Sequence, residues 1–110
     1  FNFMIGAVFT AAMTLKTKNV ASIEDIDRAW MGVTHMMFGP FGLMDSIGLD
    51  TMLSFTEYWA EKNNDRAWRK HAEFLHEYVD KGHLGKKTKK GFYDYPKPAF
   101  MQPEFLKGIK

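Results

Sequence analysis

The spacing of apolar residues constrains the fold of this chain more than any other feature. Between Asn2 and Lys18, apolar side chains recur every three or four residues and fill most of the positions in between. That spacing predicts an α-helix, with Asn2 at the position of its N-cap. Because such a helix is apolar nearly all round, we expect it to be buried on most sides or to lie in an interface between subunits.

Start and stop signals predict four further helices. They are a helix capped by Ser22 that ends before Gly32–His35, a short helix over Phe41–Ile47 between Pro40 and Gly48, a helix from Thr51 to about Lys62 capped by Asp50, and a helix capped by Asp65 that runs up to Gly82. The loops between them are short, so consecutive helices should pack as neighbours.

Beyond Gly82 the residues favour irregular structure. Phe92–Tyr95 is too short and too aromatic for a helix and is predicted to be extended, and prolines recur in the residues that follow. One further turn is expected around Glu104–Lys107. The predicted fold is therefore all-α, with five helices and a short extended tail in a single domain, as the length of 110 residues favours.

Composition and charge exclude several classes of protein. The 15 Lys and Arg against 13 Asp and Glu leave a net charge of +2, which is too small to indicate binding to nucleic acid or to a membrane. With no cysteine, disulfides, thiol nucleophiles and thiolate metal sites are excluded. Residues 1–60 carry three basic and six acidic groups (−3), and residues 61–110 carry twelve and seven (+5). This asymmetry favours contact between the halves or between copies of the chain.

Few residues form a pattern typical of catalysis or of metal binding. His71 and His76 are five residues apart, so they lie on different sides of a helix, and surface or capping roles are favoured over a metal site. Glu24, Asp25 and Asp27 lie at the start of a helix. We attribute them to the positive end of the helix dipole rather than to acid–base chemistry.

Two loop segments each allow two interpretations. The Lys86–Lys90 segment, between two glycines, either wraps a phosphate or forms a solvated surface loop, and the second interpretation is favoured. Met36-Met37-Phe38 either fills the core or lines a site for an apolar ligand, since methionine adapts to variable shapes. From the spacing alone we favour the core.

Several motifs occur together in a familiar order. They are Ala21-Ser22-Ile23-Glu24-Asp25-Ile26-Asp27-Arg28-Ala29, Gly39-Pro40-Phe41, Asp45, Gly48-Leu49-Asp50, Leu84-Gly85-Lys86-Lys87-Thr88 and Gly91-Phe92-Tyr93-Asp94-Tyr95. In this combination, residues 1–95 resemble the C-terminal helical domain of NAD-dependent 3-hydroxyacyl-CoA dehydrogenases, a family that includes 3-hydroxybutyryl-CoA dehydrogenases. The resemblance implies a fold like the C-terminal domain of 6-phosphogluconate dehydrogenase. Residues 96–110 remain as an irregular tail that contains prolines.

The resemblance implies a substrate-binding and dimerisation domain of an enzyme that interconverts 3-hydroxyacyl-CoA and 3-oxoacyl-CoA by hydride transfer with NAD. In the family an N-terminal Rossmann domain binds NAD, and that domain is absent from this chain. The chain alone is therefore expected to bind neither cofactor nor metal and to be inactive. Its expected partners are an acyl-CoA, a second copy in a homodimer, and the Rossmann domain. The lack of cysteine and of a leader favours the cytoplasm.

The resemblance also assigns a candidate catalytic residue. Asn2 occupies the position of a family asparagine that reaches the active site, where its amide donates a hydrogen bond to a substrate oxygen. Phe3 replaces the arginine that usually follows it. Without the resemblance, a simple N-cap is the favoured interpretation of Asn2.

A loop that faces the domain cleft in the family provides the candidate substrate-binding residues. These are Met37, Phe38, Gly39 and Pro40. Met37-Phe38 replaces the usual Pro-Met, and the bulk of Phe38 predicts a preference for short acyl groups. A glycine, Gly42, stands where the family has a glutamate after Gly-Pro-Phe.

Two other functions stay open from the sequence. One is a stand-alone helical module for dimerisation or interaction, without catalysis. The other is a domain of a related two-domain dehydrogenase that acts on another hydroxyacid, although the Gly-Lys-Lys-Thr and Gly-Phe-Tyr motifs argue against it. The gene sequence upstream of the codon for Phe1 would distinguish the stand-alone module from the domain of an enzyme.

Overall fold

The computed structural model confirms an all-α fold over the residues that it describes, 2–63 and 66–107, leaving aside the side chains of residues 2, 3 and 63. The five helices are α1 (Asn2–Thr17), α2 (Ile23–Thr34), α3 (Pro40–Ile47), α4 (Leu49–Asn63) and α5 (Arg66–Val79). Three 3₁₀ turns follow, η1 (Lys86–Thr88), η2 (Ala99–Met101) and η3 (Phe105–Lys107). Within the described ranges, pairing of the β type is limited to isolated bridges that join Gly85 to Lys90 and Lys90 to Asp94.

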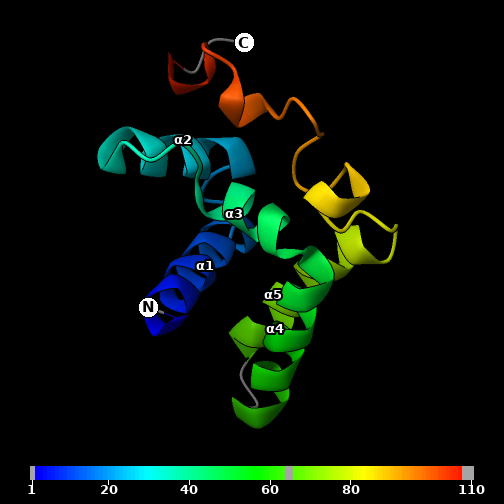
Figure 1. Cartoon of the computed structure of the whole chain (residues 1–110). Coiled ribbons are helices and arrows are strands. Elements are labelled where there is room, and N and C mark those ends of the chain that lie inside the picture. The colour runs from blue at the N-terminus through cyan, green and yellow to red at the C-terminus, as the bar shows by residue number, and fades with distance from the viewer. Residues whose placement is uncertain (1, 64–65, 108–110) are drawn as a thin grey trace.

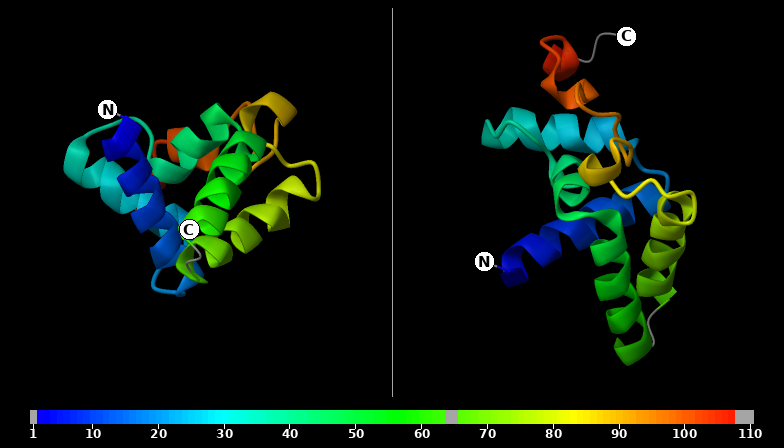
Figure 2. Two further views of the ribbon diagram at one scale, coloured as in Figure 1. Left: turned by 90° about the horizontal axis from the view of Figure 1, so that it is seen from below. Right: turned by 45° about the vertical axis from the view of Figure 1, so that its right-hand side comes forward.

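Consecutive helices pack as neighbours, as the short loops predict. Figure 1 shows α4 and α5 side by side at one end of the molecule, with α2, η2 and η3 at the other end. The right-hand view of Figure 2 shows α1 and α3 between these ends. The centre of the core is formed by side chains with no measurable exposure, namely Phe41, Met44, Leu49 and Leu75.

Helix α2 begins as predicted and ends later than predicted. Its N-cap Ser22 accepts a hydrogen bond from the backbone N–H of Asp25 at 3.1 Å. The expected end before Gly32 is wrong, because the helix continues to Thr34 and stops where His35 turns left-handed (φ 62°). One exposed glycine costs a helix only about 1 kcal/mol, and the packing of α2 outweighs that cost.

The junction between α3 and α4 is a single residue. Pro40 opens α3 and Gly48 closes it with a φ of 111°, as predicted. Asp50 was expected to cap α4 but is its second residue, because the N–H of Leu49 donates to the carbonyl of Leu84 at 2.8 Å. This distant carbonyl satisfies a donor at the start of α4, so the helix starts earlier than the local sequence indicates.

Helix α5 is shorter than predicted. It ends at Val79, and residues 80–82 form a turn in which Gly82 has a φ of 78°. The predicted N-cap, Asp65, lies outside the described residues.

Helix α1 is buried along one side only. Phe9, Ala12 and Met13 enter the core, whereas Met4 is 67% exposed and Leu15 is also exposed. Apolar surface of α1 is therefore left open in the single chain. None of the described helices is both long and apolar enough to cross a membrane.

Candidate functional site

The family motifs converge on two buried aspartates, the first of which is Asp27 on α2. One carboxylate oxygen accepts the N–H of Phe41 at 2.9 Å, and the other accepts the N–H of Gly42 at 3.0 Å and the hydroxyl of Tyr93 at 2.9 Å. The N-cap of α3, Gly39, has no side chain to offer these donors. Asp27 therefore caps a helix other than its own.

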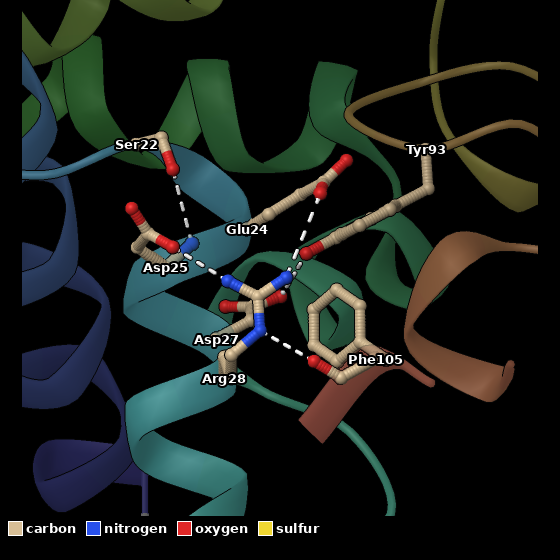
Figure 3. A network of polar contacts seen from close by, with 7 residues as sticks. All are labelled: Ser22, Glu24, Asp25, Asp27, Arg28, Tyr93 and Phe105. Atoms are coloured by element: carbon tan, nitrogen blue, oxygen red, sulfur yellow. Dashed lines mark hydrogen bonds and ion pairs between the residues drawn. The ribbon is translucent and has the colours of Figure 1, made fainter. Parts of the chain in front are cut away.

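The attribution of Asp27 to the dipole of its own helix is therefore wrong. Glu24 and Asp25 do lie exposed in the first turn of α2, as that interpretation requires. Asp27 faces inward and has no exposed surface (Figure 3). A Cβ on Gly39 would lie 2.4 Å from the Cγ of Asp27, so the glycine of the Gly-Pro motif is what lets α2 and α3 approach.

The second buried aspartate is Asp45 on α3. Its oxygens accept the N–H groups of Phe92 and Tyr93 at 2.9 and 3.0 Å, and the hydroxyl of Tyr95 at 2.7 Å. Gly85 also lies against Asp45, since a Cβ there would be 2.3 Å from the backbone oxygen of Asp45. The residues predicted to be extended, Phe92–Tyr95, are thus held by a carboxylate on α3.

Burial changes the ionisation of these groups. It raises the pKa of Asp27 from 3.8 to about 6, although the three hydrogen bonds to the carboxylate partly oppose the shift. It also raises the pKa of Asp45, with the same opposition. Burial and the neighbouring carboxylates raise the pKa values of Tyr93 and Tyr95, so both hydroxyls remain donors. The two aspartates and the two tyrosines therefore form a structural centre that joins α2 and α3 to residues 92–95.

We expect the contribution of Asp27 to the free energy of unfolding to fall as the pH rises from about 4 to about 6. A carboxyl with a higher pKa in the folded state binds its proton more tightly there, so the stabilisation is fully present below 3.8 and is lost above about 6. The shift corresponds to about 2–3 kcal/mol. The pKa of His76 is raised by Asp80 and Glu57 and acts in the same direction. Urea titrations across this pH range, in a His76→Gln background with and without Asp27→Asn, measure how much of the pH dependence comes from Asp27. If Asp27→Asn leaves the slope of the unfolding free energy against pH unchanged, the expected contribution of Asp27 is contradicted.

The candidate substrate loop leads from α2 to this centre. Gly39 and Pro40 are buried at the start of α3, Phe38 is half-buried, and Met37 is 79% exposed. The preference for core filling by Met36-Met37-Phe38 is wrong for both methionines, which face solvent. The loop enters α3 just before Phe41 and Gly42, whose N–H groups donate to Asp27, while the apolar side chain of Met37 is open to solvent. Asn2 is the first residue of α1, and its side chain lies outside the description.

The histidines take separate structural roles. His71 was expected at the surface or in a cap, but it is 2% exposed, with its Nε2 3.1 Å from the hydroxyl of Thr14 on α1. His76 lies 2.9 Å from both Glu57 and Asp80. Among the described residues, no three His, Asp or Glu side chains are grouped as metal ligands.

The Lys86–Lys90 segment is exposed. Lys87 pairs with Asp50 at 2.8 Å and Lys90 with Asp94 at 3.8 Å. These pairs fit a solvated loop that is tied to the fold.

Sequence reasoning missed the two aspartates as a unit. The available signal was Gly39-Pro40, a helix start whose cap has no side chain and which therefore needs an acceptor from elsewhere. It also missed the packing of residues 99–107, where Phe105 is 6% exposed.

Comparison with known proteins agrees with these motifs. Residues 1–95 match the family described as 3-hydroxyacyl-CoA dehydrogenase, C-terminal domain. The chain is 42% identical over 78 residues to a 3-hydroxybutyryl-CoA dehydrogenase of Bradyrhizobium diazoefficiens, covering 71% of this chain and 26% of that protein. It is 38% identical over 85 residues to the human mitochondrial hydroxyacyl-coenzyme A dehydrogenase, covering 76% and 27%.

Solved structures support the fold. The (S)-3-hydroxybutyryl-CoA dehydrogenase of Ralstonia eutropha matches with a TM-score of 0.71 and 34% identity, over 88% of this chain and 34% of that one. The chain thus spans about a quarter to a third of the length of these relatives. With the family match across the first 95 residues and an all-α fold that agrees, the chain belongs to the 3-hydroxyacyl-CoA dehydrogenase family, as its C-terminal domain.

Proposed function

We propose that this chain binds acyl-CoA and mediates dimerisation in an enzyme that interconverts 3-hydroxyacyl-CoA and 3-oxoacyl-CoA, in the cytoplasm. The observation that carries the proposal is the family match over residues 1–95, which includes Asn2 at the head of α1 and the loop before α3. The family match ends at residue 95, and residues 96–110 lie beyond it. The relatives' names supply the reaction class.

The cofactor is assigned to a domain outside this chain. NAD is held in proteins by a strand–helix–strand unit with a glycine-rich turn before the helix. The described residues form five helices with isolated bridges between single residues, and no such unit is found among them. We therefore propose that a Rossmann domain outside this chain binds NAD and presents it for hydride transfer.

Within this division, Asn2 is the residue through which the chain reaches the reacting oxygen. An amide at the head of a helix donates a hydrogen bond where negative charge develops on the substrate oxygen. Asn2→Ala is expected to lower kcat for acetoacetyl-CoA reduction with NADH by about a hundredfold in the protein expressed from its complete reading frame.

Asn19→Ala is the matched control, because Asn19 lies in the turn after α1, at the other end of the helix. Equal kcat values for the Asn2→Ala protein and wild type would remove Asn2 from the site. Absence of turnover by the wild-type protein would favour the stand-alone module instead.

Dimerisation is proposed from the open side of α1. An apolar groove of about 530 Å³ runs between α1 and α2, lined by residues that include Ala7, Ala11, Leu15, Trp30 and Val33. A second copy that covers this groove would bury apolar surface that a single chain leaves in water.

Light scattering is expected to give a dimer. Val33→Glu should weaken the affinity of dimerisation at least tenfold. Val33 is 82% exposed in the groove, and the dimer would bury an unpaired charge there, which is costly. Val20→Glu is the control, since Val20 is 65% exposed in the turn between the helices. A monomer at high concentration, or equal weakening by both substitutions, would contradict this interface.

A further inference from the structure

The segment 96–107 lies beyond the family match but is packed onto α2. Arg28 of α2 holds it: Nε donates a hydrogen bond to the carbonyl of Phe105, and the guanidinium lies 4.5 Å from the centre of the Phe105 ring (Figure 3). Asp25 fixes the same guanidinium at 2.5 Å, and Glu24 lies 3.9 Å from it. The segment is therefore part of the folded domain.

Phe100 of this segment packs against Gly42 on α3, where there is no side chain. A Cβ on Gly42 would lie 3.1 Å from Cε2 of Phe100, so a longer side chain at position 42 would displace the ring. On its other side the ring packs edge-on against Tyr93, with the ring centres 5.0 Å apart. The missing side chain at position 42 and the ring at position 100 are thus complementary.

Docked in this way, the segment forms one wall of an apolar groove of about 470 Å³. The groove is lined by the end of α2, the loop that follows it, and the segment, namely Met31, Gly32, His35, Met36, Met37, Phe100, Met101 and Leu106. Methionine provides half of these eight residues, and its flexible side chain adapts to flexible apolar ligands. Met37, Met101 and Leu106 are each more than half exposed, so a ligand can reach them.

The groove is continuous with the candidate substrate loop. Met37 belongs to both, whereas Phe38 is not among the described residues that line the groove. The bulk of Phe38, which predicted short acyl groups, therefore does not narrow this space. An acyl chain is the flexible apolar group that the names of the relatives supply.

We propose that this groove binds the distal carbons of the substrate's acyl chain and that Met101 and Leu106 set the preference for chain length. The inference rests on the proposed function and adds a specificity element from outside the matched domain. Each methylene that the groove covers is expected to raise affinity about fourfold. The protein should then favour chains longer than four carbons.

The test is the ratio of kcat/KM for 3-oxodecanoyl-CoA to that for acetoacetyl-CoA, measured with NADH on the protein from its complete reading frame. The double variant Met101→Ser, Leu106→Ser is expected to lower this ratio about tenfold or more, because each side chain contributes apolar contact to the long chain alone. Gly42→Glu, which displaces Phe100, is expected to lower it as well.

The matched control is Phe55→Ser, in a second apolar pocket of about 270 Å³ that α1 and α4 help to line. Phe55 is 47% exposed, comparable to Leu106 at 54%, so both substitutions should be tolerated by the fold. The ratio for Phe55→Ser should stay within about twofold of wild type. A fall in the kcat/KM ratio for Phe55→Ser, with no change in the ratio for the double variant, would overturn the inference. It would place the acyl chain of the substrate in the second pocket.

Calorimetric titration with decanoyl-CoA and butyryl-CoA separates this inference from the proposed function. Absence of turnover in the wild type would contradict the proposed function, while a preference for decanoyl-CoA that the double variant loses would still support the groove. No difference between the two ligands in wild type overturns the inference. Loss of dimerisation in the double variant would also overturn the inference, because a second copy of the chain would then occupy the groove.

Discussion

Replacing Asp27 with alanine is expected to lower the free energy of unfolding by about 3 kcal/mol. The substitution removes the acceptor for three buried donors, the N–H groups of Phe41 and Gly42 and the hydroxyl of Tyr93. Burial of the Asp27 carboxylate is itself unfavourable, as its raised pKa indicates. Removing that buried charge therefore offsets part of the loss. Since domains of this size are stable by about 5–15 kcal/mol, the change is a large share of the total.

Urea unfolding followed by circular dichroism measures this effect. Glu24→Ala is the control on the same helix, because Glu24 is exposed and lies 3.9 Å from Arg28 in a pair that is expected to contribute under about 1 kcal/mol. Equal stability of the Asp27→Ala protein and wild type would mean that water replaces the carboxylate, and that Asp27 does not hold α2 against α3.

Gly85→Ala is expected to cost about 4 kcal/mol or to prevent folding. Its Cβ would lie 2.3 Å from the backbone oxygen of Asp45, and neither backbone can move without breaking the hydrogen bonds around Asp45. Its φ of 112° adds strain for any residue with a side chain.

Comparison with Gly82→Ala distinguishes the cost of the clash at Gly85 from the cost of a positive φ. Gly82 also has a positive φ, 78°, but no atom lies within 4 Å of its Cβ position, so about 1 kcal/mol is expected. Gly32→Ala, in open space within α2, should be neutral or stabilising by about 0.5–1 kcal/mol. Melting temperatures of the three proteins give the order, and a Gly85→Ala protein as stable as Gly82→Ala would contradict the predicted clash.

Local signals predicted the helices because those signals act within a few residues. Ser22 and Pro40 mark helix starts through their own side chains, and Gly48 marks an end through its own φ. The predicted boundaries were wrong where distant groups intervene, as at Leu49, whose N–H finds the carbonyl of Leu84. Short-range patterns contain no information about such partners.

The candidate site shows the same division. The resemblance indicated the loop at Met37–Pro40, and the sequence could not show that Met37 stays exposed while Pro40 is buried. Asp27 was assigned to the helix dipole because it lies near the start of its helix in the sequence. Its actual partners are 14, 15 and 66 residues away, which only the packed structure brings together.

Tyr93 connects the two buried aspartates, and this has a consequence for the order of events during synthesis. Its hydroxyl reaches back 66 residues to Asp27 and its N–H reaches back 48 residues to Asp45. While the ribosome is still translating the earlier helices, both carboxylates are without these donors. Because a domain usually folds as a unit, the chain should stay open to proteases and chaperones until residues 93–95 have left the exit tunnel.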